Sequence, residues 1–376
     1  MRRIKVMSIF GTRPEAIKMC PLVCELQKRP EIESCVLVTA QHRELLDEVT
    51  AYFGVKADYD LNLMKPGQTL EGITSGVLCG VSEVLRGMEA KPDIVLVHGD
   101  TTTSFAAALA AFYQKIPVGH VEAGLRSFDR YSPFPEEMNR LMTGRIAEVH
   151  FSPTKNNAAN LAREGVTEKV YVTGNTGLDA LRYTVKPDHV FAEEKLRDPA
   201  LFEGRRVVVL TAHRRENLGE GLDSIARAVR RLALAYPDLS IIDPMHPNPA
   251  VRRSLVPVLG DLPNVTLTEP IGVADMHNLL SRACLCLTDS GGLQEEAPAL
   301  GLPVLVLRRE TERPEAAEAG TVKVIGTEED VIFAEAKRLL DDCAAYEKMA
   351  NAVNPYGDGH ASERIADILC SLYAGS

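Results

Sequence analysis

Short apolar runs alternate with amphipathic runs along most of the chain. Uninterrupted apolar runs of this kind are typical of strands that are buried on both faces of a parallel sheet. They predict six strands in the first half, over residues 4–10, 34–39, 93–97, 117–121, 148–151 and 169–172. They predict six more in the second half, over residues 206–210, 239–242, 265–267, 283–288, 303–307 and 321–324.

Helical periodicity fills several of the stretches between these strands. The clearest cases are residues 70–88, 101–113, 219–236 and 329–340. Apolar residues in such a helix recur every three or four positions and form one buried face. Strands that alternate with helices predict an α/β fold, and right-handed crossovers make each set of strands a doubly wound parallel sheet.

The chain is long enough for two domains. It has 376 residues, and a domain usually takes roughly 100–200. The strand pattern breaks after residue 173, which predicts a first domain of residues 1–173 and a second that begins at Gly174. Residues 186–203 are charged and contain two prolines, which indicates a surface segment that opens the second domain.

Charge and cysteine usage narrow the class of function. The formal net charge is −10, which argues against a nucleic-acid partner or an anionic membrane surface. The sequence shows no membrane span and no signal peptide, so we expect a cytoplasmic protein. The eight cysteines form no CxxC pair, and we interpret all of them as buried thiols in a reducing compartment.

Polar clusters follow the predicted strands, at the sheet edge where α/β proteins bind ligands. The first strand leads into Gly11 and Thr12, then into a helix with Arg13, Pro14 and Lys18. Glycine permits a tight turn, proline suits the first helical turn, and a helix N-terminus attracts an anion. Arg13 can form paired hydrogen bonds to a phosphate, although an ordinary turn with a surface arginine is the other interpretation.

Carboxylates dominate the remaining strand ends of the first half. Asp100 either caps the next helix or is available for chemistry if Thr101 provides the cap. Glu122 ends a strand that we expect to be buried, where a carboxylate is either paired or functional. Glu136 and Glu137 begin a helix, where negative charge is favourable. We interpret Glu137 as structural and leave both roles open for Glu136.

The second half supplies cations and glycines at its strand ends. His213 lies beside Arg214 and Arg215 after a buried strand, which favours an anion site. A later strand leads into residues 290–292, whose Ser-Gly-Gly sequence offers backbone N–H groups to a diphosphate. Glu296 lies one helical turn further and can accept hydrogen bonds from both hydroxyls of a ribose.

Ten motifs together resemble the bacterial non-hydrolysing UDP-N-acetylglucosamine 2-epimerase family. They are GTRPEAIK (11–18), TAQHREL (39–45), HGDTTT (98–103), HVEAGLR (120–126), YSPFPEE (131–137), VTGNT (172–176), TAHRREN (211–217), DSGGLQEEAPALG (289–301), TERPEAAEAGT (311–321) and NPYGDGHAS (354–362). No single motif is decisive, but ten in order at this spacing are specific.

The resemblance implies two Rossmann-like doubly wound domains that face a central cleft, the GT-B architecture. It implies that residues 174–358 form the UDP-binding domain and that a C-terminal helix, about residues 359–376, returns to the first domain. It also implies a homodimer that binds a UDP-sugar and uses no cofactor, NAD or metal.

Residue roles follow from the matched motif positions. The resemblance implies four catalytic residues: Asp100, Glu122, Glu136 and His213. It implies UDP-binding roles for Arg13, Lys18, Ile271, Met276, Ser290, Gly291, Gly292, Glu296 and Arg313. Because Ile271 and Met276 differ from the residues that the family often has, we expect uracil to be recognised there through backbone groups.

Many relatives also bind a second UDP-N-acetylglucosamine as an activator. Gln41, Arg214 and His246 fit that pattern, and Glu44 lies in the same stretch. Glu44 stands where the family has glutamine, and Gly76 stands where it has arginine. Because these departures remove cationic or neutral partners of a phosphate, we expect activation to be weak or absent.

The reaction that the resemblance implies is inversion of carbon 2 of UDP-N-acetylglucosamine, through loss and readdition of UDP, for polysaccharide biosynthesis. Three alternatives remain open from the residues. A hydrolysing epimerase would trap the same intermediate with water. A GT-B glycosyltransferase would need an acceptor groove, and a UDP-sugar sensor would not need three carboxylates together with His213.

Overall fold

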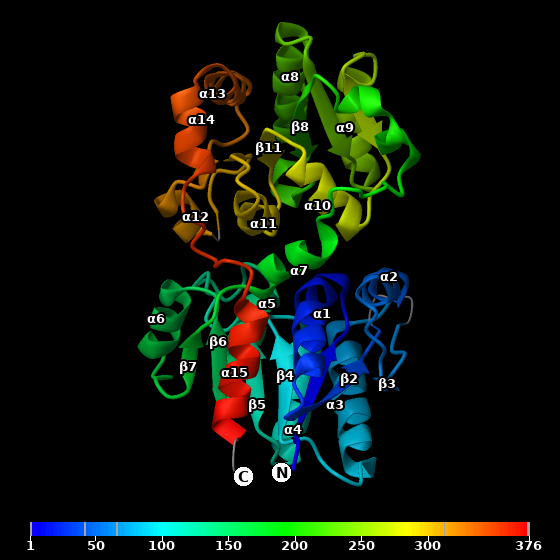
Figure 1. The fold of residues 1–376 in the computed structure, drawn as a ribbon, viewed down its shortest axis with the longest axis vertical. Coiled ribbons are helices and arrows are strands. Elements are labelled where there is room, and N and C mark those ends of the chain that lie inside the picture. The colour runs from blue at the N-terminus through cyan, green and yellow to red at the C-terminus, as the bar shows by residue number, and fades with distance from the viewer. Residues whose placement is uncertain (1, 41–42, 65–66, 312, 374–376) are drawn as a thin grey trace. The chain divides into compact units, whose positions relative to one another are not determined.

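A computed structural model describes residues 2–40, 43–64, 67–311 and 313–373, without the side chains of Glu44 and Leu45. The chain divides into two α/β units, each built on one parallel sheet (Figure 1). Unit 1 comprises Met1–Tyr183 and Tyr356–Ser376, and unit 2 comprises Thr184–Pro355. The two parallel-sheet units confirm the predicted α/β class.

The unit 1 sheet has the strand order β3-β2-β1-β4-β5-β6-β7. Its strands are β1 (Ile4–Phe10), β2 (Ile32–Val38), β3 (Tyr59–Asp60), β4 (Ile94–His98), β5 (Val118–Val121), β6 (Val149–Ser152) and β7 (Val170–Val172). All six strands predicted for this half form within two residues of their predicted ends. The short edge strand β3 was not predicted, because two residues are too few to carry a hydrophobic period.

Helices cover this sheet. They are α1 (Arg13–Lys28), α2 (Arg43–Phe53), α3 (Leu70–Gly87), α4 (Thr102–Tyr113), α5 (Glu136–Ile146), α6 (Lys155–Arg163), α7 (Thr176–Thr184) and α15 (Ala361–Tyr373). The alanines of α4 are fully buried and pack with α3, β1 and β4 in one core. Small side chains let α4 approach the sheet closely, which places its N-terminus beside the end of β1.

The unit 2 sheet has the order β10-β9-β8-β11-β12-β13. Its strands are β8 (Arg206–Thr211), β9 (Leu239–Pro244), β10 (Val265–Thr268), β11 (Leu285–Thr288), β12 (Val304–Val306) and β13 (Val322–Val324). Its helices are α8 (Glu220–Ala235), α9 (Pro249–Leu259), α10 (Val273–Ser281), α11 (Leu293–Ala299), α12 (Pro314–Ala319), α13 (Glu329–Asp341) and α14 (Cys343–Ala350). The apolar face predicted for residues 219–236 is buried in the core.

Both sheets reverse their strand order at one point. In unit 1 the reversal lies between the paired strands β1 and β4, and in unit 2 it lies between β8 and β11. Loops after such strands diverge to opposite faces and leave room for a ligand at the carboxyl edge. Arg13 and Asp100 follow the two reversal strands of unit 1, and His213 and Ser290 follow those of unit 2.

The chain passes between the units after Tyr183 and after Pro355, rather than at the predicted positions near residues 173 and 359. Unit 1 keeps α7 because this helix is tied to the returning C-terminal segment. Asp179 in α7 accepts hydrogen bonds from the N–H groups of Ala361 and Ser362 at 3.1 and 2.8 Å. These two N–H groups begin α15, which packs on α1.

The cysteines differ from the prediction in their burial. All eight are free, but only Cys20, Cys35 and Cys286 are buried; three are half-buried, and Cys79 and Cys343 are exposed. Cys79 lies on the solvent side of α3, and Cys343 is the first residue of α14. Within the described ranges, every helix is too short or too polar to span a bilayer.

Candidate active site

A buried carboxylate organises the two loops at the reversal point of unit 1. Glu15 accepts hydrogen bonds from the N–H groups of Gly11 and Thr12 at 3.0 and 2.8 Å, which completes a capping box at the start of α1. It also accepts from the hydroxyls of Thr101 and Ser104 at 2.7 and 2.9 Å. Glu15 therefore joins the loop after β1 to the loop after β4, next to Arg13. Burial raises the pKa of Glu15, and these hydrogen bonds oppose that shift.

Asp100 does not cap helix α4. Thr101 is the N-cap residue, and its hydroxyl accepts from the N–H of Ser104 at 3.0 Å. The Asp100 carboxylate instead pairs with Arg140 of α5, with distances of 2.9 Å to Nε and 2.6 Å to Nη2. Asp100 is therefore held as an oriented carboxylate at the sheet edge.

Glu122 lies in a buried ion pair with Lys18 of α1. Its Oε2 also accepts from Asn175 Nδ2 at 3.1 Å and lies 3.7 Å from His98 Nε2. The backbone of Glu122 has a φ of 64°, a left-handed conformation that is costly for a residue with a side chain and that clusters at functional sites. Lys18 and Asn175, which are distant from each other in sequence, thus hold this carboxylate.

The neighbours Glu136 and Glu137 have different environments. Glu137 accepts from the N–H groups of Ser127 and Phe128 at 3.0 and 3.1 Å, and from Arg140 Nη1 at 3.2 Å. This network confirms its predicted structural role. Glu136 begins α5, and its buried Oε2 has no hydrogen-bond partner among the described residues. An unsatisfied buried oxygen calls for a functional explanation.

Three buried histidines lie behind these carboxylates, on β4, β5 and β6. Burial lowers the pKa of His98 to about 4, of His120 to about 3 and of His150 to about 4. His120 and His150 are register partners on adjacent strands, and His120 Nε2 bonds to the carbonyl of Gly99 at 2.7 Å. All three rings are therefore neutral at pH 7 and add no positive charge near Glu122.

The first loop of the unit 2 site is held by Asp289. This fully buried carboxylate accepts from the N–H groups of His213 and Arg214 at 2.8 Å, and from Asn217 Nδ2 at 3.0 Å. Its Oδ1 lies 3.9 Å from His213 Nε2. Burial lowers the pKa of His213, whereas Asp289 acts in the opposite direction. The His213 ring stacks on His246 with centroids 5.1 Å apart.

Two guanidinium groups converge at Gly291. A Cβ added to this glycine would lie 3.4 Å from Arg214 Nη2 and 3.7 Å from Arg313 Nη2. Arg313 is oriented by Glu295, whose Oε1 accepts from Nε at 2.5 Å. The glycine thus lets two cations and a bare backbone come together, which is the arrangement that a diphosphate requires.

The remaining unit 2 candidates surround the start of α11. The N–H of Ser290 donates to Thr288 Oγ1 at 2.9 Å, and Gly292 is the N-cap of the helix. The Oε1 of Glu296 would lie 3.6 Å from a Cβ at Gly292, and its Oε2 lies 3.4 Å from His277 Nε2. This carboxylate is held where a hydroxyl-bearing group can reach it.

Other candidates are less closely connected to these groups. Ile271 is buried, and Met276 is half-buried on α10. His246 is exposed, and its Nδ1 accepts from the N–H of Asn248 at 3.1 Å. Gln41 and the side chain of Glu44 lie outside the described part of the chain, so this structure does not place their contribution to an activator site.

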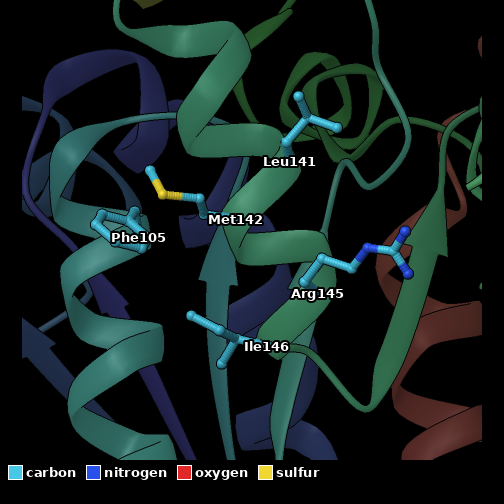
Figure 2. Close-up of a pocket in the computed structure, with 5 residues that line it drawn as sticks. All are labelled: Phe105, Leu141, Met142, Arg145 and Ile146. Carbon is cyan, nitrogen blue, oxygen red and sulfur yellow. The ribbon is translucent and has the colours of Figure 1, made fainter.

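One apolar pocket lies away from the strand ends. Its volume is about 370 Å³, and Phe105 of α4 and Leu141, Met142, Arg145 and Ile146 of α5 line it. Figure 2 shows Met142 and Ile146 pointing toward the helix that carries Phe105, whereas the Arg145 guanidinium points away. None of the candidate residues lines this pocket, and we do not assign the reaction to it.

Several organising residues were not predicted from the sequence. They are Glu15, Arg140, Asn175, His277 and Asp289. Only Glu15 carries a local signal, the Thr-x-x-Glu capping box that begins at Thr12. The other four act through partners that are distant in sequence.

Comparisons with known proteins agree with this arrangement. A family model described as UDP-N-acetylglucosamine 2-epimerase matches residues 24–370. The UDP-N-acetylglucosamine 2-epimerase of Bacillus subtilis (strain 168) is 53% identical over 376 residues, covering 99% of this chain and 97% of the relative. The enzyme of that name from Escherichia coli K12 is 50% identical over 373 residues, covering 97% and 98%.

A solved structure extends the likeness to three dimensions. It is the UDP-GlcNAc 2-epimerase of Neisseria meningitidis bound to UDP-GlcNAc, with a TM-score of 0.87 and 49% identity, covering 98% of this chain and 100% of that one. Matches of this length include both α/β units. We conclude that the chain belongs to the UDP-N-acetylglucosamine 2-epimerase family, a family of isomerases.

Proposed function

We propose that this protein is a non-hydrolysing epimerase that interconverts UDP-N-acetylglucosamine and UDP-N-acetylmannosamine. The observation that carries the proposal is the division of chemistry between the units. Unit 1 carries Asp100 and Glu122 at strand ends and Glu136 at the start of α5. Unit 2 gathers Arg214 and Arg313 around Gly291. Carboxylates suit proton transfer on a sugar, and the guanidinium pair suits a diphosphate.

The chemistry of the substrate dictates the route. Carbon 2 bears an acetamido group and has no carbonyl beside it, so its proton is not acidic enough for direct removal. Departure of UDP breaks the bond between carbon 1 and oxygen and develops positive charge at carbon 1. A base then removes the carbon 2 proton, giving 2-acetamidoglucal and UDP. Readdition of UDP with a proton delivered to the opposite face of carbon 2 completes the inversion.

The three carboxylates have different capacities for this work. Asp100 and Glu122 have cationic partners in Arg140 and Lys18, which hold the two carboxylates in fixed orientations and suit them to stabilise a cation at carbon 1. Glu136 has a buried oxygen with no hydrogen-bond partner among the described residues. We assign removal of the carbon 2 proton to Glu136, because an oxygen that is not committed elsewhere can accept a proton; a different acid delivers the proton to the opposite face.

The leaving group is stabilised by unit 2 and needs no metal in this proposal. The Arg214 and Arg313 guanidinium groups neutralise the diphosphate, and the 290–292 backbone and His213 donate hydrogen bonds to it. Glu296 accepts from the ribose hydroxyls, and Ile271 and Met276 lie on the uracil side. The role of Arg13 in phosphate binding rests on the likeness to the family. The epimerase of N. meningitidis bound to UDP-GlcNAc supports this class of ligand.

We also propose a homodimer that works in the cytoplasm and supplies N-acetylmannosamine units for cell-surface polysaccharide. The free state of all eight cysteines supports a reducing compartment. The dimer and the pathway rest on the likeness to the family. Light scattering of the purified protein distinguishes a dimer from a monomer directly.

Solvent exchange tests the reaction. The protein incubated with UDP-N-acetylglucosamine in D₂O is expected to yield UDP-N-acetylmannosamine with one deuterium at carbon 2, because the proton delivered to the opposite face comes from a group that has exchanged with solvent. Proton NMR locates the deuterium and identifies the product. A product that keeps its original hydrogen would refute elimination. Release of free N-acetylmannosamine in place of the UDP-sugar would identify the hydrolysing reaction instead.

Activation by a second UDP-N-acetylglucosamine is expected to be weak or absent. Arg214 already lies at Gly291 beside Arg313, where we place the substrate diphosphate. Gly76 has no side-chain donor, and among the described residues a Cβ there would meet only Leu63. The Glu44 charge would repel a second phosphate. Each lost or opposed contact costs on the order of 1–3 kcal/mol, or roughly 5- to 150-fold in affinity.

The reverse reaction measures this activation. Started from UDP-N-acetylmannosamine alone, it should proceed without a lag. Trace UDP-N-acetylglucosamine should not accelerate it. A long lag that micromolar UDP-N-acetylglucosamine abolishes would show that other residues bind the activator.

A further inference from the structure

Helix α10 carries three polar side chains that are almost fully buried: Asp275, His277 and Asn278. Buried polar groups are costly unless they are hydrogen-bonded, so their partners indicate what they are for. Their partners lie in the segment with which unit 2 begins and in the start of α11.

Two of these side chains hold the opening segment of unit 2. Asp275 accepts from the N–H groups of Ala192 and Glu193 at 3.0 and 3.1 Å, and bonds to His189 Nε2 at 2.7 Å. Asn278 donates to the carbonyl of Thr184 at 2.7 Å and accepts from the N–H of Lys186 at 2.9 Å. Residues 184–193 are thus fixed to α10 through backbone groups. These bonds account for Asp275 and Asn278 as structural residues.

His277 has a different pair of partners. Its Nδ1 lies 2.7 Å from Thr184 Oγ1, and its Nε2 lies 3.4 Å from Glu296 Oε2. An ionised carboxylate can only accept, so Nε2 carries the hydrogen of that bond. In the neutral ring Nδ1 then accepts from the Thr184 hydroxyl. Thr184, His277 and Glu296 therefore form one directed chain of hydrogen bonds.

The chain ends on the carboxylate to which we assign ribose binding. The His277 side chain is 1% exposed and that of Glu296 is 14% exposed, so the bond between them lies largely out of water. Glu296 Oε1 is close to Gly292, on the side where the diphosphate backbone site lies. A carboxylate that accepts hydrogen bonds from two adjacent hydroxyls must keep its plane in one orientation. A donor bonded to Oε2 fixes that orientation.

We infer that His277, itself held by Thr184, is a positioning residue that orients Glu296 for the two ribose hydroxyls and so sets the preference for ribonucleotides. The inference rests on the proposed function, because it requires a UDP moiety at the start of α11. Neither His277 nor Thr184 touches the sugar that reacts. Their loss should therefore alter nucleotide affinity and leave the proton-transfer residues of unit 1 in place.

The test compares UDP with 2′-deoxy-UDP by calorimetry on the full-length protein. The wild type should bind UDP at least about tenfold more tightly than the deoxy analogue, since the analogue leaves a carboxylate oxygen without its partner. His277→Leu keeps apolar volume but removes the donor, and should reduce this ratio to below about threefold. His277→Gln, which can place an N–H near the original Nε2, should restore most of it.

Thr184 provides a matched pair with a smaller change in shape. Thr184→Val removes only the hydroxyl and keeps the carbonyl that Asn278 uses. It should lower the ratio between UDP and 2′-deoxy-UDP, whereas Thr184→Ser should keep it. In steady-state assays both His277→Leu and Thr184→Val should raise KM by about tenfold with little change in kcat.

The outcomes separate the two proposals. Wild-type protein that binds no UDP would overturn the proposed function. Wild-type protein that discriminates against 2′-deoxy-UDP, together with His277→Leu or Thr184→Val variants that discriminate equally well, would overturn the positioning role alone. If His277→Leu fails to fold, as judged by its circular dichroism, the comparison of Thr184→Val with Thr184→Ser decides the matter.

Discussion

Replacement of Glu136 by glutamine is expected to lower kcat for epimerisation by roughly 10²–10⁴-fold, the usual contribution of a general base. The substitution keeps the shape of the side chain but removes the ability to take a proton. Because Oε2 of Glu136 has no hydrogen-bond partner among the described residues, stability should fall by less than about 1 kcal/mol, the value of a charge at a helix N-terminus. Steady-state kinetics and thermal unfolding measure the two effects.

The adjacent residue provides the control. Glu137→Gln should destabilise the protein by about 1–3 kcal/mol, because three donors face its carboxylate and an amide nitrogen cannot accept from them. Those donors are the N–H groups of Ser127 and Phe128 and the Arg140 guanidinium. A Glu136→Gln variant with wild-type kcat would exclude Glu136 as the group that removes the proton. An unchanged melting temperature for Glu137→Gln would contradict its structural role.

Asp243→Asn is expected to stabilise unit 2, and more so at high pH. Asp243 is almost fully buried at the end of β9, and its Oδ2 has no hydrogen-bond partner among the described residues. Burial, followed by the charge of Asp289, raises its pKa to about 8. The unfolded carboxyl loses its proton near its ordinary pKa, so the folded state alone retains it as the pH rises.

The sign of the effect follows from that difference in bound protons. Between its ordinary pKa and about 8, the folded state binds more protons than the unfolded state, so rising pH lowers the free energy of unfolding. Above a pH of about 8, both states have lost this proton and the free energy of unfolding falls no further on its account. Asparagine does not titrate, so the free energy of unfolding of Asp243→Asn does not fall in this way. Its excess over the wild type should grow between pH 5 and pH 8 and reach about 1–3 kcal/mol, or about 2–8 °C in melting temperature.

Thermal unfolding at pH 5, 6.5 and 8 measures this advantage. The exposed Asp188 supplies the matched substitution, and Asp188→Asn should show no growth of stability with pH. A melting temperature for Asp243→Asn that stays below that of the wild type at pH 8 would show that the carboxyl makes a favourable contact in its buried site.

The sequence predicted the strands well because their signal is local. Apolar runs and the breaks between them depend on neighbouring residues, and twelve strands formed close to their predicted ends. The features that were not predicted are those without a local signal. Two-residue β3 carries no period, and the passage between the units depends on how α7 meets the C-terminal segment.

The pairing of the site residues was beyond a local pattern. The sequence left Asp100 open between a cap and a catalytic group, and the choice depended on Thr101 taking the cap. Lys18 and Glu122 are 104 positions apart, and His213 and Asp289 are 76 apart. Such pairs form because parallel strands that are distant in sequence end at the same sheet edge.

The sequence by itself therefore determined the α/β class, the location of the candidate groups at strand ends and the family. Those features follow from hydrophobic period, turn residues and motif order, all of which are written along the chain. The tertiary structure alone decided which carboxylates are paired and that His277 lies between Thr184 and Glu296. The physical reason is that hydrogen-bond partners are selected by sheet order and helix packing, which bring together residues that no local pattern connects.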